Sequence, residues 1–338
     1  MPPGPLCDLP SERLVNSLLE VSNVRVRFRV QGGLQAYIKG NKDPFIDAVR
    51  DVSFSISEGE TFTLVGESGS GKSTLAMAVA GLHKTAEGSM LFEGEDIASM
   101  DDDAMQNYRK QISFMWQNPV GSLSPRLSVG ALISEPFRIH GLKQADRKAE
   151  SDRLLKLVGL PTHFSERYPH QLSGGQARRV GVARALALHP KLIIADEPTA
   201  GLDVSVQGEI LNLLNRLQDE LGVSMFVITH NLNIVRHISD RTAIMYLGRF
   251  VELGPTDDIF SQAKHPYTLA LLSANPEANP DAQINRIELK GEVPSLLQRP
   301  AGCEFHTRCP FVAERCNRDF PPATASDNDH WLTCHYPR

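Results

Sequence analysis

The chain has 338 residues, enough for one large domain or two modest domains with proper hydrophobic cores. Its formal net charge of -5 argues against a dedicated nucleic-acid-binding protein. No apolar run approaches the roughly 18 to 20 residues needed to span a bilayer, and the first residues lack the basic start and apolar core of a signal peptide. We therefore expect a soluble protein on the cytoplasmic side that reaches a membrane only through a partner.

Two stretches near the start alternate apolar and polar residues as strands do, residues 18–28 and 48–56. We expect them to form an antiparallel edge beside a nucleotide-binding core. An aromatic side chain near the end of the first strand could stack on adenine. Phe28 is the preferred residue and Tyr37 and Phe45 are rivals, while an ordinary core role for Phe28 is an equally good alternative.

A glycine-rich stretch at residues 66–74 has the spacing GxxxxGK[ST] of a phosphate-binding loop. A β-forming run precedes it and a helix-forming run follows it, as this motif requires. Glycines let backbone N–H groups wrap a phosphate at a helix N-terminus, Lys72 would contact the β- and γ-phosphates, and the Ser73 hydroxyl would bind Mg²⁺. The predicted nucleotide-binding residues here are Gly66, Glu67, Ser68, Gly69, Ser70, Gly71, Lys72, Ser73 and Thr74.

A β-type run over residues 112–116 ends at Gln117, which is followed by Asn118 and Pro119. An amide side chain at the end of a strand can reach a bound metal ion or water while its loop senses another protein. The alternative is a solvated loop amide with no function.

Residues 128–158 have apolar residues at helical spacing and interrupt the alternation of strands and helices. We expect a helical subdomain, about residues 120–185, inserted in the nucleotide core. Within it, a serine and two glycines open another helix and leave N–H groups for a second anion site. The residues of this second site are Ser173, Gly174, Gly175 and Gln176.

The apolar run 192–197 is a buried strand that ends in two carboxylates. Asp196 suits an outer partner of Mg²⁺, and Glu197 suits the base that orients an attacking water. A strand-end pair that caps the next turn is the alternative. Residues 223–228 form a further buried strand, and His230 at its end is expected to contact the γ-phosphate, although an isolated histidine is more often structural.

The helix that begins after Asp203 carries an apolar stripe, which we assign to the core and not to a cofactor site. Its members are Ile210, Leu213, Leu214, Leu217 and Leu221. Two further strands, residues 241–247 and 249–253, complete the core with Gly248 in the turn between them.

The phosphate loop, Gln117, LSGGQ, LIIADE, GLD and His230, in that order, resemble the nucleotide-binding subunit of ABC (ATP-binding cassette) transporters. The resemblance implies an α/β fold of the ABC-type P-loop NTPase class: a mixed sheet with an antiparallel β edge and an inserted helical subdomain. It implies an ATPase with ATP and Mg²⁺ as cofactors and adds Asp203 to the nucleotide site. It also implies that two subunits pair head to tail around two ATP molecules, with LSGGQ of one closing on the phosphate loop of the other.

Further segments resemble the oligopeptide/dipeptide importer branch: QNP with SLSPR after residue 116, HPYT at 265–268, GEVPS at 291–295 and GCEFHTRCP at 302–310. This branch implies two transmembrane permease subunits, a sister ATP-binding subunit in preference to a homodimer, and indirectly a substrate-binding protein. Localisation would be peripheral, on the cytoplasmic face of the inner membrane. GLD, THNL and QARR replace the commoner ALD, SHDL and QRQR, and none of these changes removes a catalytic side chain.

Four of the five cysteines lie in the last 36 residues, at Cys303, Cys309, Cys316 and Cys334, while Cys7 stands apart and is expected to be inert. A cytosolic chain should not hold stable disulfides, so metal ligation is their natural use. The intervals do not fit the CxxC pairs of common zinc sites. Importers of this branch resemble this tail and some carry a four-iron four-sulfur cluster there, which we transfer to these cysteines. Zinc, with His306, His330 or His335 as substitutes, and free thiols are the alternatives.

The predicted organisation is a loose segment 1–17, an ABC ATPase domain 18–262 and a C-terminal region 263–338 with the four cysteines. The predicted function is ATP hydrolysis that energises import of di- and oligopeptides. Alternatives are another cargo of the branch (oligosaccharide, nickel or opine) or a soluble ABC-type ATPase. A soluble one would have a long coiled-coil arm or two cassettes, and only 124 residues separate Lys72 from Asp196.

Overall fold

The computed structural model describes residues 17–29, 45–141, 144–275, 286–326 and 329–338. The chain divides into two compact units. The first unit comprises the chain up to Ser57, Phe62–Ser99 and Thr229–Arg338, and the second comprises Glu58–Thr61 and Met100–Ile228. Tyr37, Cys7 and nearly all of the predicted loose segment lie outside the described residues.

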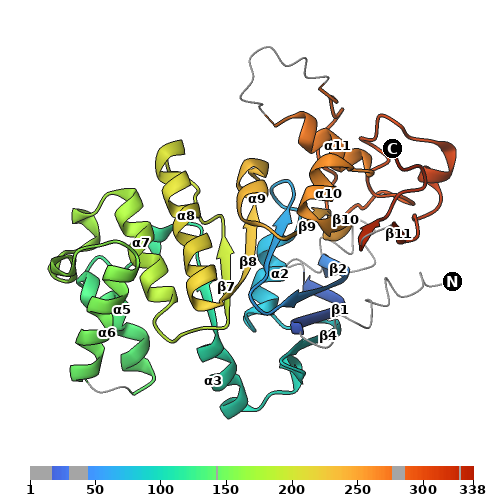
Figure 1. Ribbon diagram of the computed structural model, residues 1–338. Helices are drawn as coiled ribbons and strands as arrows, with labels where there is room; N and C mark the ends of the chain where they lie inside the picture. Colours follow the sequence, from blue (N-terminus) through green and yellow to red (C-terminus); the bar gives the residue numbers. More distant parts are fainter. Residues whose placement is uncertain (1–16, 30–44, 142–143, 276–285, 327–328) are drawn as a thin grey trace. The chain divides into compact units, whose positions relative to one another are not determined.

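The first unit contains most of the strands and the C-terminal region (Figure 1). Its strands are β1 (Ser17–Arg29), β2 (Phe45–Ser57), β3 (Thr61–Val65), β4 (Glu87–Phe92), β5 (Glu95–Asp96), β9 (Arg241–Tyr246), β10 (Arg249–Pro255), β11 (Thr324–Ser326) and β12 (His330–Leu332). Its α-helices are α2 (Lys72–Val79), α9 (Leu232–Ile238), α10 (Thr256–Ser261) and α11 (Pro266–Ser273). Two single-turn helices are η2 (Ile97–Ser99) and η5 (Glu314–Asn317).

The strands of the first unit form two sheets. One has the order β2-β1-β4-β5 and is antiparallel throughout. In the other, the neighbours run β11-β12-β10-β9-β3, and β3 pairs with β9 in parallel. The two strands near the start were predicted to form an antiparallel edge beside the core, and this is confirmed: they belong to an antiparallel sheet of their own. The physical reason is face-to-face packing, because Phe54 of β2 stacks on Phe62 of β3 with ring centroids 4.7 Å apart.

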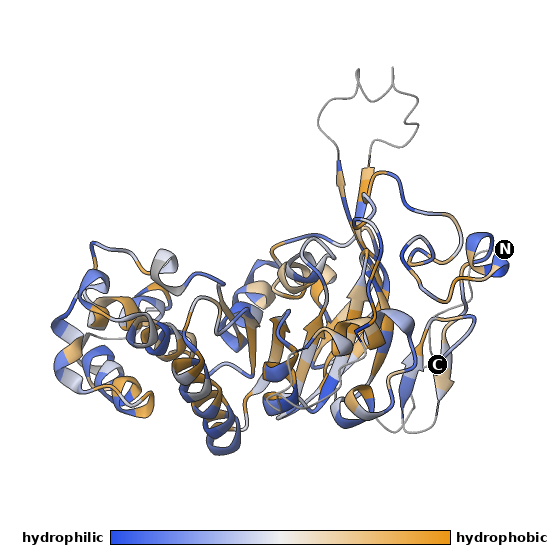
Figure 2. Ribbon diagram, turned by 90° about the horizontal axis from the view of Figure 1, so that it is seen from above, coloured by the Kyte–Doolittle hydropathy of each residue, from blue (hydrophilic) through white to orange (hydrophobic). Residues whose placement is uncertain are grey.

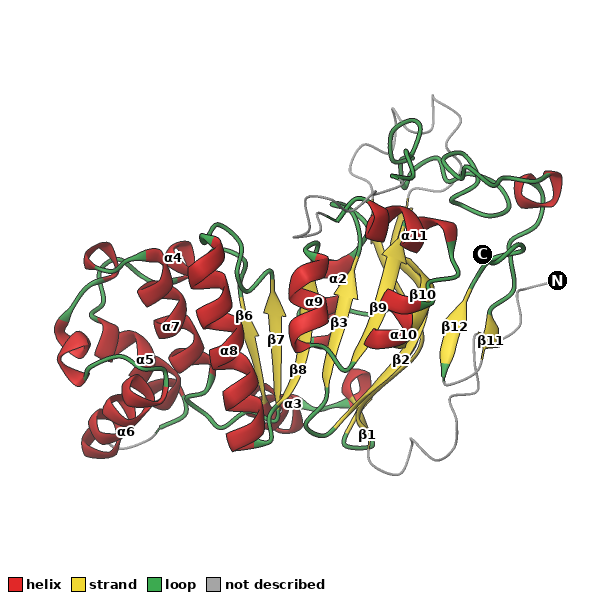
Figure 3. Cartoon of the chain, turned by 45° about the horizontal axis from the view of Figure 1, so that its top comes forward, coloured by secondary structure: helices red, strands yellow, loops and turns green. Residues whose placement is uncertain are grey.

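The second unit carries most of the helices (Figure 3). Its α-helices are α3 (Asp102–Gln111), α4 (Pro119–Ser122), α5 (Val129–Ile139), α6 (Gln144–Leu157), α7 (Gly174–Ala185) and α8 (Val204–Leu221). Between α6 and α7 lie the single turns η3 (Thr162–Glu166) and η4 (Pro169–Gln171). Its strands β6 (Ile112–Met115), β7 (Leu192–Asp196) and β8 (Ser224–Thr229) pair in parallel, with β7 in the centre.

Buried strands supply most of the hydrophobic interior. Every residue of β3, β7, β8 and β9 is buried, as the continuous apolar runs of the sequence predict. Figure 2 shows these strands mainly in the hydrophobic colours. The helical insert also appears as α5 and α6, which confirms helices in the predicted stretch.

The apolar stripe of α8 is in the core, with one exception. Ile210, Leu213, Leu214 and Leu217 are buried, but Leu221 is 45% exposed. The helix ends at this leucine, where Gly222 takes a left-handed conformation with φ 66°, so Leu221 stands at the very end of the stripe. The prediction that Leu221 belongs to the core was therefore wrong.

Candidate nucleotide-binding and hydrolysis site

The predicted phosphate loop connects β3 to the N-terminus of α2, as expected from the sequence. Gly69 and Gly71 have φ angles of 78° and 104°, which a residue with a side chain rarely adopts. A Cβ atom on Gly71 would lie 2.3 Å from the backbone oxygen of Ala48, so both the angle and the space require glycine. The sequence motif thus has the local conformation that it needs to present backbone N–H groups to an anion.

Lys72 is the first residue of α2 and only 9% of it is exposed. Its ammonium group donates to the backbone oxygens of Gly66 at 2.7 Å and Glu67 at 2.9 Å. The ammonium therefore lies directly at the loop, within reach of a phosphate placed there.

The loop is supported from the turn between β9 and β10. The backbone N–H of Gly248 donates to the backbone oxygen of Ser70 at 2.7 Å. A Cβ on Gly66 would lie 2.3 Å from the backbone oxygen of Met245, so the loop and this part of β9 are in close backbone contact. These contacts fix the loop without using its side chains.

Two of the three aromatic candidates for adenine stacking lie within the described residues, and both are exposed. Phe28 is 39% exposed and meets His83 edge to face, with ring centroids 5.1 Å apart. Phe45 is 41% exposed, with the guanidinium of Arg27 5.7 Å from its ring centroid. Phe28 is not a core residue, so the core alternative was wrong, and its stacking on adenine stays a prediction.

Asp196 is the last residue of β7, and Glu197 follows it directly. Both are almost buried, with 7% and 8% exposed. Glu197 has a φ of 50°, in the left-handed region that is unfavourable for a residue with a Cβ. Its N–H donates to the backbone oxygen of Ile228 in β8 at 2.8 Å, which holds this conformation. Local strain of this kind, about 1 to 3 kcal/mol, concentrates at functional sites.

The two glycines after Ser173 begin α7 (Gly174–Ala185), as expected from the sequence. Ser173 is the N-cap, and its hydroxyl accepts the N–H of Gln176 at 3.3 Å. The Gln176 side chain in turn accepts the N–H of Ser173 at 3.1 Å. This capping box occupies two of the N–H groups that were predicted to be bare, and those of Gly174 and Gly175 remain for an anion.

Asp203, a predicted site residue, and Asn231, which follows one, both cap helices. Asp203 accepts the N–H of Val206 at the start of α8 at 2.9 Å. Asn231, the departure next to His230, accepts the N–H of Asn233 at the start of α9 at 3.0 Å. Asparagine is as good an N-cap as aspartate, so this substitution keeps the local geometry. His230 itself is exposed, directly after β8.

Gln117 is exposed at the end of β6. Its backbone oxygen accepts from the guanidinium of Arg178 in α7 at 3.3 Å. The same guanidinium donates to the backbone oxygens of Trp116 at 3.4 Å and Ala200 at 3.1 Å. Burial lowers the pKa of Arg178 to about 10. A single cation thus ties the Gln117 loop to the helix of the LSGGQ stretch and to the segment after Glu197.

Sequence reasoning treated Arg178 only as a departure from a motif and missed this contact. A signal was present, since Arg178 shares one face of α7 with Val182 and Ala185, which are buried. A charged residue on an apolar face needs polar partners. Their identity, three carbonyl oxygens, could not be deduced from the helix alone.

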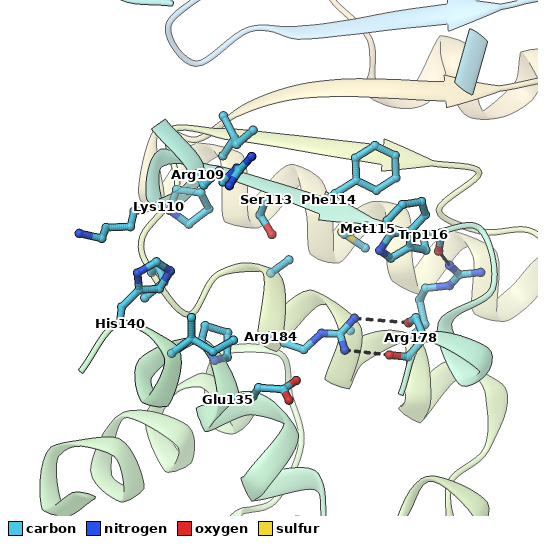
Figure 4. Close-up of a pocket in the computed structure, with 18 residues that line it drawn as sticks. Arg109, Lys110, Ser113, Phe114, Met115, Trp116, Glu135, His140, Arg178 and Arg184 are labelled. Atoms are coloured by element: carbon cyan, nitrogen blue, oxygen red, sulfur yellow. Dashed lines mark hydrogen bonds between the residues drawn. The ribbon is translucent and has the colours of Figure 1, made fainter. Parts of the chain in front are cut away.

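The second unit has a pocket of about 290 Å³ beside the Gln117 loop (Figure 4). Cationic side chains and exposed apolar ones share its lining, among them Arg109, Lys110, Trp116, Ile139, His140 and Arg184. Arg184 is held by the backbone oxygen of Ser122 at 2.9 Å.

The four cysteines of the C-terminal region are free thiols that line one pocket, together with His265, His306 and His335. Burial raises the pKa of Cys303 to about 12 and also raises the pKa values of the Cys309 and Cys334 thiols. Thiols and imidazoles are donors of the kind that zinc and iron–sulfur sites use, although a raised pKa disfavours the thiolate form that binds a metal. In the described part of the chain, however, no three His, Cys, Asp or Glu side chains are arranged to hold a metal ion. The predicted iron–sulfur or zinc ligation does not fit the side chains as they lie.

The predicted site residues fall into two groups. The phosphate loop, Phe28, His230 and the cysteines lie in the first unit. Gln117, the LSGGQ stretch, Asp196, Glu197 and Asp203 lie in the second. A phosphate loop at a strand-to-helix turn and a buried strand ending in two acids define the class of P-loop nucleoside triphosphatases.

Comparison with known proteins identifies the branch of this class. The family "ABC transporter" matches residues 49–200, and the family "Oligopeptide/dipeptide transporter, C-terminal region" matches residues 251–316. The oligopeptide transport ATP-binding protein OppF of Haemophilus influenzae is 43% identical over 321 residues, 94% of this chain and 96% of that protein. AppF of Bacillus subtilis, with the same description, is 42% identical over 94% of this chain and 97% of its own.

Solved structures agree. A dimeric ATP-binding cassette in a post-hydrolysis state with ADP and phosphate superposes with a TM-score of 0.61 at 30% identity, covering 70% of this chain and 98% of that one. The cbiO1 subunit of Clostridium perfringens gives a TM-score of 0.64 at 29% identity, covering 73% of this chain and 92% of its own. The chain belongs to the ATP-binding proteins of ABC transporters, and it is an ATPase that acts with membrane subunits.

Proposed function

We propose that this chain binds and hydrolyses ATP at the residues identified above and thereby drives a transporter that imports di- and oligopeptides. The observation that carries the ATPase part is Glu197, a nearly buried carboxylate in a left-handed conformation at the end of β7. A general base needs a fixed position relative to the water that it activates. In this proposal Lys72 contacts the β- and γ-phosphates, His230 contacts the γ-phosphate, and Ser73, Gln117 and Asp196 take part in binding Mg²⁺.

The peptide cargo rests on the relatives. OppF and AppF are described as oligopeptide transport proteins, and a 38% identical relative from Pseudomonas aeruginosa is described as a di/tripeptide transport protein. The C-terminal region matches a family of the same description. Oligosaccharide, nickel and opine remain the alternative cargoes, because the ATPase itself does not touch the cargo.

In the proposed assembly the chain pairs head to tail with a sister ATPase on the cytoplasmic face of the inner membrane. We assign the pocket beside the Gln117 loop to a cytoplasmic helix of a permease subunit. The exposed Trp116 and Ile139 would bury apolar side chains of that helix. Arg109 and Lys110 suit acidic groups on it. No helix of the described residues is long and apolar enough to cross a membrane.

Arg178 connects this pocket to the segment after Glu197, so binding of a permease helix can affect the proposed base. The guanidinium holds the backbone of Trp116, which lines the pocket, and the backbone of Ala200, three residues after Glu197. A permease helix that shifts Trp116 therefore acts on the segment that carries the base. This is a contiguous chain of contacts within the second unit.

The test is anaerobic purification of the chain from membranes, with the co-purifying proteins and metals identified by mass spectrometry. The proposal predicts two permease subunits and a second ATPase, and peptides should stimulate ATP hydrolysis when the binding protein is added. A chain that comes out alone, with no membrane subunit, would contradict the transporter role.

The same preparation decides the metal content. The iron–sulfur cluster stays a prediction. The four cysteines line one pocket, which supports it, but the described side chains are not arranged to hold a metal ion. About four irons per chain would confirm a cluster. One zinc per chain, or neither metal, would support the zinc or free-thiol alternatives.

A further inference from the structure

Arg308 of the C-terminal region contacts the phosphate loop from 241 residues away in the sequence. One guanidinium nitrogen donates to Oε2 of Glu67 at 2.8 Å, and the other donates to Oε1 at 3.1 Å. A bidentate ion pair of this kind fixes both the position and the orientation of the carboxylate. The side chains are 8% and 27% exposed, so water screens the pair only in part.

A second contact holds the backbone of the same residue. The hydroxyl of Tyr267 in α11 accepts the N–H of Glu67 at 3.1 Å. Tyr267 packs against Tyr246 and Phe305, with ring centroids 4.9 Å and 5.3 Å apart. Since Phe305 lies three residues before Arg308, these rings anchor the segment that delivers the guanidinium.

Glu67 creates an electrostatic problem in a loop that binds phosphates. A free carboxylate at this position has the same charge sign as the nucleotide and would weaken its binding. Arg308 neutralises the carboxylate and holds it in place. The pKa of Arg308 is raised, since the attraction of Glu67 outweighs the effect of burial, so the guanidinium stays charged.

We propose that Arg308 is a positioning residue for nucleotide binding, which makes the C-terminal region a working part of the phosphate site. It acts through Glu67 and does not itself touch the nucleotide. The inference rests on the proposed role of residues 66–74 as the ATP site. It gives the C-terminal region a function that depends neither on a metal nor on a membrane partner.

The experiment measures the dissociation constant of Mg-ATP by calorimetry for the full chain and its variants. Arg308→Met should weaken binding about tenfold, because one carboxylate beside the phosphates loses its partner. Arg308→Lys keeps the charge but not the bidentate contact. Its dissociation constant should lie between those of the wild type and Arg308→Met. The double variant E67Q/R308M should bind ATP about as tightly as the wild type, since the unpaired charge is gone.

Two controls separate the role of Arg308 from the proposed ATP site at residues 66–74. Arg315→Met removes an exposed arginine of the same region that pairs with Asp319, and it should leave binding unchanged. Lys72→Ala should abolish binding, and unchanged binding would contradict the proposed site itself. If Lys72→Ala fails to bind while Arg308→Met binds normally, the inference about Arg308 is wrong. Weak binding by Arg308→Met that the double variant does not restore would also overturn it, because it would indicate a merely structural role.

Discussion

Arg178 shows how one side chain can join several functional segments. It is 1% exposed and its contacts are three backbone oxygens in different segments of the second unit. A guanidinium in such a position has lost its hydration and depends on these acceptors. Removing it takes the donor away from three partly buried carbonyl groups, and each hydrogen bond of this kind contributes about 0.5 to 1.5 kcal/mol.

We predict that Arg178→Met lowers the rate of ATP hydrolysis at least about tenfold while the affinity for ATP stays within about twofold of wild type. The reason is that the Gln117 loop and the segment after Glu197 lose their common anchor. A tenfold lower rate corresponds to an activation free energy raised by about 1.4 kcal/mol. Steady-state hydrolysis and calorimetric binding measure the two quantities separately.

The neighbouring Arg179 offers a matched control. It donates to the backbone oxygen of Val158 at 2.8 Å and pairs with Glu209, and it does not contact the Gln117 loop. Arg179→Met should keep the wild-type turnover. Equal loss of turnover in both variants would show that the effect comes from general destabilisation of α7.

At the scale of elements, the C-terminal region is joined to the rest of the first unit by a buried polar network. Glu252 of β10 is 1% exposed and accepts from the N–H groups of Lys264 and His265. It also pairs with His330 of β12 at 2.8 Å. Through its ring Nδ1, His265 accepts the N–H of Tyr267 and so caps α11. This network aligns β10, β12 and α11 without any metal.

Burial lowers the pKa of His265 to about 4, although Glu252 acts in the opposite direction. A histidine with a lowered pKa takes up a proton more readily in the unfolded chain, so stability falls as the pH drops below the ordinary value of about 6.5. We predict that the free energy of unfolding decreases by about 2 kcal/mol between pH 7 and pH 5 through this residue. Urea unfolding at the two pH values measures it.

His265→Asn is the matched variant, because asparagine can still accept the capping N–H but does not titrate. Its loss of stability between pH 7 and pH 5 should be smaller than that of the wild type by this amount. The same pH dependence in both proteins would show that His265 is already protonated or exposed.

The elements near the phosphate loop could be predicted because their determinants are local. The GxxxxGK[ST] spacing, the β-forming residues before it and the helix-forming residues after it all act within about 20 residues. The start of α7 at the serine and two glycines could also be predicted, and the structure adds the capping box between Ser173 and Gln176 that stabilises this first turn.

For the whole molecule, the chain order and the family resemblance predicted the class of protein correctly. What could not be predicted are contacts between distant segments, such as Arg308 with Glu67 and Arg178 with three carbonyl groups. No local pattern encodes such pairs, because they depend on which surfaces the folded chain brings together. The sequence predicted that the first two strands are antiparallel and lie beside the core, but it could not show which layer covers them, because alternation shows only that a strand has a buried face.

We predict that this chain hydrolyses ATP with Glu197 as the base, and the variant Glu197→Gln tests this role. Glutamine has nearly the same shape but cannot accept the proton of the attacking water, so turnover should fall by about 10²- to 10⁴-fold. Binding of ATP should persist, and size-exclusion chromatography with Mg-ATP should show a trapped dimer. Glu209→Gln, a change of an exposed carboxylate on α8, is the control that should hydrolyse ATP normally. Undiminished hydrolysis by Glu197→Gln would contradict the account, because the base would then lie elsewhere.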